Sequence, residues 1–326
     1  MPEYLTPGVY FEFQDAAASV IRQVRMDITG FVGLAERGPL NQPTQIDSWR
    51  QFQVLFGNFV PYGYLAYAVK GFFENGGRTC FIVRVAGVTA AQATHTLKNS
   101  AGTEVMQFTA VNEGSWGNHI AIALTQVRPS KLDFSLTIFR NSLDRESFFQ
   151  LSIKPDDPRY FVHILNEGDD RTAPSQWIRV EDLIDPSLPR TASLLPDIEK
   201  SKTDAEKSKI KQPLVLLNGG QDGISSLTTN DFLGTTDLLA SDRKGLSAFD
   251  RVHAIGIVCI PDIHIQPVLL FPPAPPEVEP PRDPCIPITA PIQSATPIPA
   301  TTFEQPPLFT LNQVAQVQQA LVEHCE

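Results

Sequence analysis

The first apolar stretch of the chain has the period of a β-strand. In YLTPGVYFEF, residues 4–13, the apolar Val9, Phe11 and Phe13 occupy every second position, and a period of two gives a strand one apolar face. The Pro-Gly pair in front of them is typical of a turn. Chain termini are usually polar and frayed, so an apolar strand at this position requires an explanation.

Apolar positions three and four residues apart then predict two helices between two strands. ITGFVGLAERGP (28–39) and CFIVRV (80–85) are expected to be strands, the second of them buried. The first helix is expected to begin after Asp47 or Ser48, and the second to end at the Asn-Gly-Gly of residues 75–77. The inner faces of the helices are expected to consist of Trp49, Phe52 and Phe56, and of Leu65, Ala68, Val69 and Phe72. This order of elements is typical of half of an α/β layer.

The pattern changes after Gly87 to short strands separated by turns. Four apolar runs lie at 104–111, 119–127, 132–140 and 147–153. Such a series predicts a small β-rich module.

A short helix and a return of the α/β pattern are expected next. The Asp pair at 156–157 is expected to cap the helix, with Pro158 in its first turn. QWIRVEDL (176–183) is expected to be a strand. PLVLLNGGQDG (213–223) is a strand that runs into a glycine-rich turn, and HAIGIVCIPD (253–262) is expected to be a buried strand.

A proline-rich stretch and an amphipathic helix follow. Residues 266–309 are dense in proline, which excludes helix and central strand, so we expect an insert that is partly polyproline II. The final helix (310–326) is expected to be capped by Thr310. Its apolar face is formed by Leu311, Val314, Val317 and Leu321.

These patterns predict a mixed α/β (α+β) fold, in which a small β-rich domain is inserted into an α/β core and an extended arm comes first. The expected parts are an N-terminal arm and tether (1–27), the first part of the α/β core (28–86), the inserted β-rich domain (87–180), the second α/β part (181–265), the proline-rich insert (266–309) and the amphipathic helix (310–326).

The charge of the chain argues against two classes of partner. Its 326 residues carry a formal net charge of −10, and an acidic chain lacks the basic face that nucleic acid or an anionic membrane requires. We therefore expect no nucleic acid partner and no direct membrane binding. EKSKTDAEKSKIKQ (199–212) holds five lysines but also three acidic residues, which is typical of a solvated face.

The first residues have neither the basic nor the apolar region of a signal peptide. No run approaches the roughly 20 apolar residues of a membrane span. We therefore expect folding and assembly in the cytoplasm. There the four cysteines would be free thiols, and they are Cys80, Cys259, Cys285 and Cys325.

The best candidate for ligand chemistry is NGGQDG (218–223). Glycine-rich turns after a strand can cradle phosphate through backbone N–H groups, but this one lacks the Lys-Ser/Thr of a P-loop. We interpret it instead as a tight loop in which Asp222 bonds its own backbone.

Other catalytic and metal-binding patterns are absent from the sequence. There is no histidine pair with ligand spacing and no CxxC. The serine of GSWG (114–117) has the wrong spacing for a nucleophile elbow. The acidic pairs at 156–157 and 169–170 are better explained as caps and turn formers. We therefore expect no catalytic residue, no metal and no cofactor, and a structural or binding protein rather than an enzyme.

Several stretches, in their order along the chain, resemble the contractile tail sheath proteins. YLTPGVYFEF, TGFVGLAERGP, SWRQFQVLFG and FFENGGRTCFIVRV follow the N-terminal pattern of that family. EGSWGNHIAIAL, ESFFQLSIKPDDPRYFVHILN, LNGGQDGISSLTTNDFLG, DRKGLSAFD and IVCIPD continue it. The resemblance covers most of residues 4–265 and resumes in the final helix. It assigns structural motif roles to Gly30, Gly33, Trp116, Gly117, Asn118, Gly219, Gly220, Asp222 and Gly223.

The resemblance implies a structural role in the outer tube of a phage tail, an R-type bacteriocin or a related injection system. The implied partners are copies of the chain in a helical lattice of rings and an inner tube protein. Assembly would take place in the cytoplasm, and the particle could be released. The alternative is a non-contractile baseplate or adhesion module.

The resemblance also implies a use for the N-terminal strand. In the family this segment leaves its own subunit and adds a strand to the sheet of a neighbour, with residues 15–27 as the tether. The residues implied in this contact are Tyr4, Leu5, Val9, Phe11 and Phe13.

The chain departs from the family pattern in two places. The proline-rich insert stands where a short loop is expected, and we expect it to project outward. The chain also ends where family members continue into a large C-terminal domain. Either it is a fragment, or a second sheath chain supplies that domain, or the unit is a shortened sheath.

Overall fold

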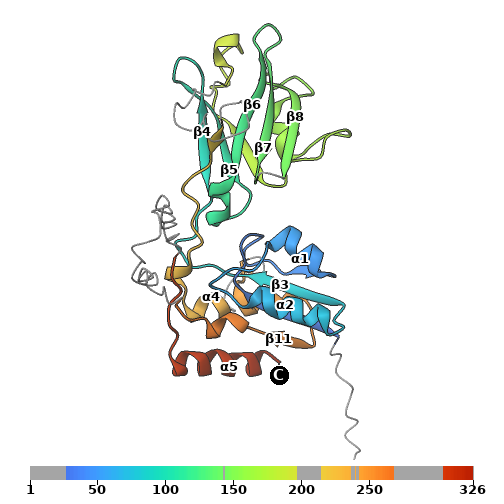
Figure 1. The fold of residues 1–326 in the computed structure, drawn as a ribbon, viewed down its shortest axis with the longest axis vertical. Coiled ribbons are helices and arrows are strands. Elements are labelled where there is room, and N and C mark those ends of the chain that lie inside the picture. Colours follow the sequence, from blue (N-terminus) through green and yellow to red (C-terminus); the bar gives the residue numbers. More distant parts are fainter. Residues whose placement is uncertain are drawn as a thin grey trace, which may run out of the picture.

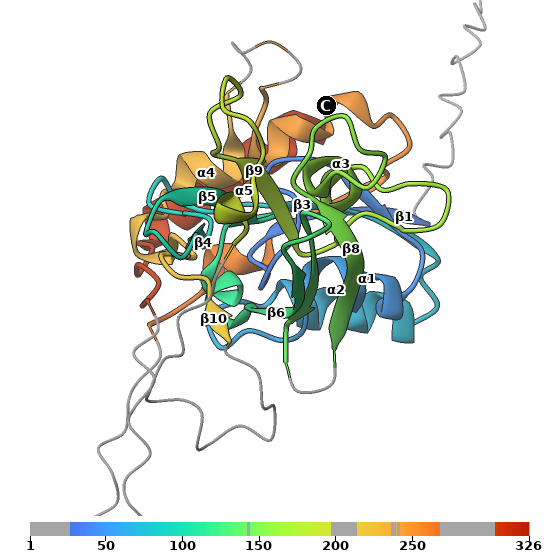
Figure 2. The same cartoon turned by 90° about the horizontal axis from the view of Figure 1, so that it is seen from above.

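The computed structural model describes residues 27–141, 144–196, 214–235, 239, 242–267 and 304–325. The chain forms two bodies along its long axis, an α/β core and a β-rich module, joined by two connecting segments (Figure 1). Seen from above, the β-rich module lies over the core (Figure 2). The expected mixed α/β class is confirmed. The N-terminal arm (1–26) and the lysine-rich segment (199–212) lie outside the described residues.

The core is built on a four-stranded sheet with the order β11-β1-β3-β2. β1 (Ile28–Gly33), β3 (Thr79–Arg84) and β11 (Ile257–Cys259) run parallel, and β2 (Thr44–Ile46) pairs antiparallel with β3. All six residues of β1 are buried, as expected for a strand covered on both faces. β3 is the predicted buried strand.

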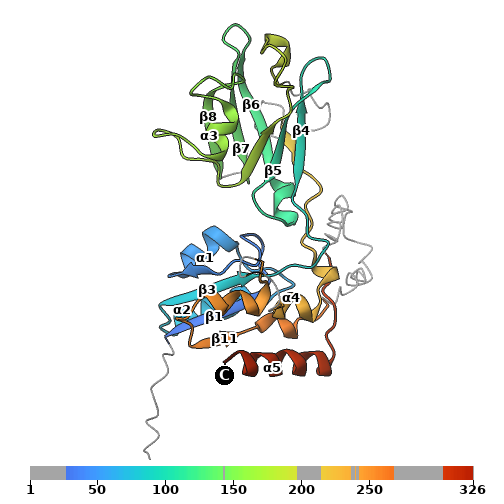
Figure 3. The same ribbon diagram turned by 180° about the vertical axis from the view of Figure 1, so that it is seen from behind.

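Helices cover both faces of this sheet (Figures 1 and 3). α1 (Trp49–Phe56) and α2 (Leu65–Glu74) lie on one face, and α4 (Thr229–Leu233), the 3₁₀ helix η4 (Gly245–Arg251) and α5 (Leu311–Cys325) lie on the other. Successive strand residues point to opposite faces. Accordingly Phe31 packs with α1 and α2, whereas Val32 packs with α4 and α5.

The predicted caps are present at the N-terminal ends of two helices, α1 and α5. The Ser48 hydroxyl accepts a hydrogen bond from the Gln51 N–H at 3.2 Å. Thr310 and Gln313 exchange bonds at the start of α5, a reciprocal arrangement that satisfies two backbone donors.

The apolar face of α5 is shorter than the sequence predicts. Val317 is fully buried, and Val314 and Leu321 pack beside it. Leu311, which was expected on the same face, is the first residue of the helix and is 87% exposed.

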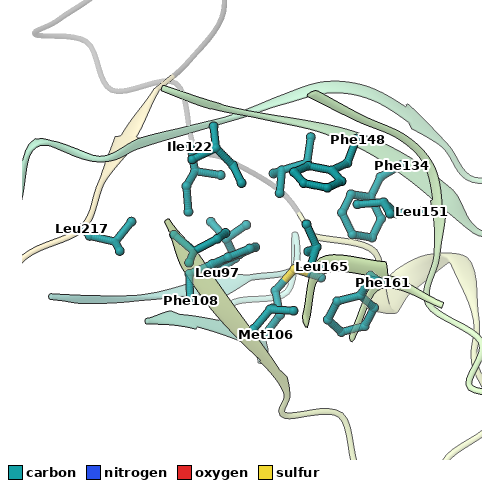
Figure 4. Close-up of a cluster of buried hydrophobic side chains, with 14 of the residues drawn as sticks. Leu97, Met106, Phe108, Ile122, Phe134, Phe148, Leu151, Phe161, Leu165 and Leu217 are labelled. Atoms are coloured by element: carbon teal, nitrogen blue, oxygen red, sulfur yellow. The ribbon is translucent and has the colours of Figure 1, made fainter. Parts of the chain in front are cut away.

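The β-rich module contains two antiparallel sheets around one core. Figure 4 shows this core, a single buried cluster to which Phe108 and Met106 of one sheet and Phe134 and Leu151 of the other belong. The sheets have the orders β4-β5-β9 and β10-β6-β7-β8. The bounds are β4 (Thr94–Lys98), β5 (Glu104–Ala110), β6 (Ala121–Arg128), β7 (Asp133–Phe139), β8 (Arg145–Ser152), β9 (Ile178–Asp182) and β10 (Val215–Leu216), with α3 (Phe161–Asn166) packed against them.

Three details of the chain differ from the predicted pattern. The stretch 253–262 forms strand only in β11, at the sheet edge, where Ile257 is 41% exposed. α3 begins later than predicted, because turns that include the Tyr160 N–H to Asp157 C=O bond occupy the residues before it. β10 pairs with β6 of the β-rich module, although its segment was expected in the second α/β part.

Among the helices of the described ranges, none combines the length and the apolar character that spanning a membrane requires.

Candidate functional site at the junction of the two bodies

The two connecting segments between the bodies are bonded to each other. The backbone of Ala91 exchanges two hydrogen bonds with that of Gln221, both of 3.0 Å, and Thr94 exchanges two with Asn218, of 2.8 and 3.0 Å. One segment leaves β3 for the β-rich module and the other returns from it, as Figure 1 shows. The junction is therefore a short antiparallel ladder rather than two independent linkers.

Two sequence motifs about a hundred residues apart meet beside this ladder. The Asn118 side chain donates to the Gly220 carbonyl at 2.8 Å and accepts from the Gly220 N–H at 2.8 Å. The structure thus brings the end of GSWGN against NGGQDG. A side chain that satisfies both backbone groups of one residue fixes the position of that loop.

Asp222 adds a second link between the same two motifs. Its carboxylate accepts from the Ser115 N–H at 2.8 Å and from the Ser115 hydroxyl at 2.6 Å. The predicted bonding of Asp222 to its own backbone is therefore wrong, because its acceptors are taken by a residue 107 positions away. Burial, followed by the nearby charge of Asp222, raises the pKa of Tyr62 of the core.

Two glycines of NGGQDG are required by their surroundings. A Cβ at Gly220 would lie 2.4 Å from the Gly114 carbonyl oxygen. Gly223 has a φ of +70° and its Cβ would lie 2.6 Å from the backbone nitrogen of Ala90. No larger residue fits without moving backbone. The glycines therefore serve close packing of backbone at the junction.

Arg84, at the end of β3, ties the core to the β-rich module. Its guanidinium donates to the carbonyls of Ala35 (3.1 Å) and Gly38 (2.9 Å) in the core, and of Glu113 (3.0 Å) beyond the connecting segment. The side chain is 1% exposed. Burial lowers the pKa of Arg84, and the nearby Tyr62 and Asp222 oppose this shift.

Asp262 forms a buried polar link within the α/β core. Its carboxylate accepts from the backbone N–H groups of Leu34 (2.5 Å), Tyr64 and Leu65 (3.2 Å), so it links β1 to the start of α2. It is completely buried, and that burial raises its pKa to about 6 although the three bonds act in the other direction.

The remaining motif residues are positioned for packing. Trp116 is buried in the core of the β-rich module, with its indole N–H directed to the Glu113 carbonyl at 3.3 Å. A Cβ at Gly117 would lie 2.7 Å from Ala93 Cβ. Gly33 lets Asp262 approach β1, since its Cβ would lie 2.3 Å from Oδ2. Gly30 faces Phe249, and Gly219 lies in the loop beside Gly220.

Sequence reasoning missed Ser115, Tyr62, Arg84 and Asp262. For Arg84 a signal was present, because an arginine inside the apolar run CFIVRV requires buried acceptors. Asp262 also follows an apolar run. For Ser115 and Tyr62 no local pattern indicates the partner.

The polar side chains at the junction connect distant segments of the chain to one another. The polar groups of Asp222, Arg84 and Asn118 bond groups within the chain. In the part of the chain that the structure describes, no cluster of histidine, cysteine, aspartate or glutamate side chains could hold a metal ion.

Comparisons with known proteins give a distant likeness. No protein-family model matches the chain, and no curated protein matches it. It is similar to the solved structure of a sheath tail protein from Listeria innocua, with 13% identity, a TM-score of 0.38 and coverage of 63% of this chain and 36% of that one. It is also similar to a sheath tail protein from Desulfitobacterium hafniense, with 14% identity, a TM-score of 0.34 and coverage of 66% and 39%.

The chain thus spans well under half of the length of these two structures. Scores at this level describe a remote likeness and carry no function by themselves. The protein resembles the tail sheath proteins.

Proposed function

We propose that this chain is a structural subunit, or part of one, of a contractile tail sheath. In this proposal, copies assemble as a helical lattice of rings around an inner tube and contract to drive that tube through a target envelope. The observation that carries the proposal is the ordered series of sheath-like motifs, two of which meet at the junction through Asn118, Gly220 and Asp222.

A sheath subunit has to move as a unit when the lattice shortens. Large transitions of this kind proceed by rotation and sliding of rigid bodies. The ladder at Ala91 and Gln221 and the bonds of Arg84 and Asp222 give the two bodies a shared set of buried polar contacts. These contacts support the idea that the β-rich module and the core travel together.

The edges of the core sheet offer a place for the proposed arm. β11 and β2 are the outer strands, and within the described ranges each pairs on one side only. An edge strand invites addition of a further strand. We assign this role to the apolar strand at residues 4–13 of a neighbouring copy. Contacts of this head-to-tail type propagate into a tube instead of closing.

Contraction needs no nucleotide in this account. The free energy is stored in an extended lattice at assembly and released when the subunits reach a lattice with more buried contact. Because the matched structures are much longer than this chain, the proposal includes a further sheath segment, on the same protein or on a second chain. In this proposal assembly takes place in the cytoplasm, and the finished particle can be released with its sheath.

The test is co-expression of this chain with the other sheath and tube components of its source, followed by electron microscopy of sedimented material. The proposal expects tubes that contain the chain, in a long narrow form and a short wide form. Tubes of one form only, or tubes without the chain, would count against it.

A further inference from the structure

A group of aromatic side chains lies on the outer side of α1 and α2, in which Phe59, Tyr64 and Tyr67 are exposed and Trp49 is half-buried against the core. Trp49 and Phe59 have ring centroids 5.4 Å apart, and Phe59 and Tyr67 have centroids 4.4 Å apart. Phe59 is 40% exposed and Tyr67 56%. Tyr64, three residues before Tyr67, is 47% exposed and lies on the same side of the helix. We call Trp49, Phe59, Tyr64 and Tyr67 the aromatic face.

The chemistry of the aromatic face restricts what can bind it. Backbone N–H and C=O groups in the body of a helix are bonded within the helix, so this surface cannot add a strand in the way a sheet edge does. It offers ring faces, two tyrosine hydroxyls and the ammonium of Lys70, whose Nζ lies 5.8 Å from the centroid of Phe59 and 3.5 Å from the carboxylate of Glu74. Rings and hydroxyls of this kind bind polyproline II segments, whose prolines pack on the rings and whose carbonyls accept hydrogen bonds.

The chain itself contains a matching sequence. FPPAPPEVEPPRDP, residues 271–284, holds seven prolines, several of them three positions apart, which in polyproline II is the spacing of one ridge. It also carries Glu277 and Glu279, and its charges sum to −2 from three acidic residues and one arginine. The ammonium of Lys70, on a side chain that is 42% exposed and paired with Glu74, is the group beside the aromatic face that complements this charge.

The nearest described residues on either side of this segment pack on the opposite face of the core sheet from the aromatic face. Ile265 precedes the segment and Phe309 follows it, and both pack in the cluster of α4 and α5. Glu304 is bonded to the Ile224 N–H at 2.6 Å. The aromatic face belongs to α1 and α2, on the other face of the sheet (Figures 1 and 3). Two complementary elements on opposite faces favour a contact between copies.

We propose that the aromatic face of one copy binds the proline-rich segment, residues 271–284, of a second copy. The contact is heterologous, so each copy gives one segment and receives another, and the contact propagates. This inference goes beyond the sheath proposal, because it requires only two copies of the chain and no contraction.

The first test measures binding of a fluorescent peptide of residues 268–286 to the full chain by anisotropy. The receptor carries Pro272→Ser, Pro273→Ser, Pro275→Ser and Pro276→Ser (the segment variant), so that its own segment does not compete. We expect saturable binding that weakens at least tenfold when Tyr67→Ala is added to the receptor. Phe149→Ala is the matched control, because Phe149 is 62% exposed on β8, and it should leave the affinity unchanged. No binding, or equal binding to the Tyr67→Ala receptor, overturns the proposal.

The second test decides whether the contact joins two copies. The full chain with Tyr67→Ala (the face variant) keeps only the segment, and the segment variant keeps only the face. We expect an equimolar mixture to sediment faster than either variant alone, because the two retained halves meet. A mixture that sediments as the sum of its separate components overturns the contact between copies. Tube formation is not measured, so failure here is distinct from failure of the sheath proposal.

Discussion

The carboxylate of Asp222 is held by the N–H and the hydroxyl of Ser115, at 2.8 and 2.6 Å, although 107 residues separate the two in sequence. This pair joins the segment that returns from the β-rich module to the loop that precedes β6. Both groups lie next to the ladder that connects the two bodies.

We expect Asp222→Ala to lower the free energy of unfolding by about 1–3 kcal/mol, because two donors of Ser115 lose their buried carboxylate acceptor. Urea denaturation followed by circular dichroism measures the change. Asp156→Ala is the control, since Asp156 is exposed, and it should stay within about 0.5 kcal/mol of the wild type. Equal stability of the two variants would show that the link is unimportant.

Arg84→Lys should destabilise the chain by about 3 kcal/mol. A lysine ammonium cannot reach the three carbonyls that the guanidinium bonds, and its charge would remain buried. The measurement is again the free energy of unfolding, with Arg145→Lys at an exposed position of β8 as the control. If the junction depends on Arg84, limited proteolysis should also cut the connecting segments faster in Arg84→Lys. An unchanged cleavage rate would argue against that dependence.

The raised pKa of the buried Asp262 leads us to expect that stability depends on pH. Its pKa is raised to about 6 from an ordinary value of 3.8, so the folded chain holds its proton more tightly than the unfolded chain. The stabilising contribution is complete below about pH 4 and is lost as the pH rises through about 6. At 1.36 kcal/mol per pKa unit, the loss amounts to roughly 3 kcal/mol.

The check is urea denaturation at pH 4, 5, 6 and 7 for the wild type and Asp262→Asn. The amide does not titrate, so the stability difference between wild type and variant should shrink as the pH rises. A difference that stays constant over this range would mean that the carboxylate is ionised throughout.

The N-terminal strand gives a prediction about assembly. Phe11→Asp places a charge on the apolar face of the strand that the sequence predicts and should abolish tubes, while circular dichroism of the subunit stays unchanged. Tyr10→Asp is the matched control, because residue 10 lies on the other face of a strand, and it should reduce tube formation less. Loss of the circular dichroism signal in Phe11→Asp would instead place the strand in the subunit's own core.

Local patterns predicted the elements of the core well. The apolar runs of β1 and β3 and the cap at Ser48 follow from the identities of adjacent residues, and the structure confirms them. These features depend on short-range physics: strand burial, helix period and the satisfaction of the first backbone donors.

The contacts of the junction were beyond such reasoning. The packing of distant segments decides which carbonyls accept hydrogen bonds from Arg84 and which serine donates to Asp222. The apolar run of β11 illustrates the same limit, since it has the composition of a buried strand but lies at the sheet edge with Ile257 exposed. A single period cannot tell the centre of a sheet from its edge.

We propose that this chain is all or part of a sheath subunit and that its two bodies move as one. The most direct measurement is cryo-electron microscopy of tubes sedimented from the source, before and after contraction, with the chain identified by its peptides. The account predicts that both forms contain the chain, that the spacing between subunits changes, and that Asn118 still contacts Gly220 in each. Tubes that lack the chain, or a β-rich module that swings away from the core on contraction, would contradict it.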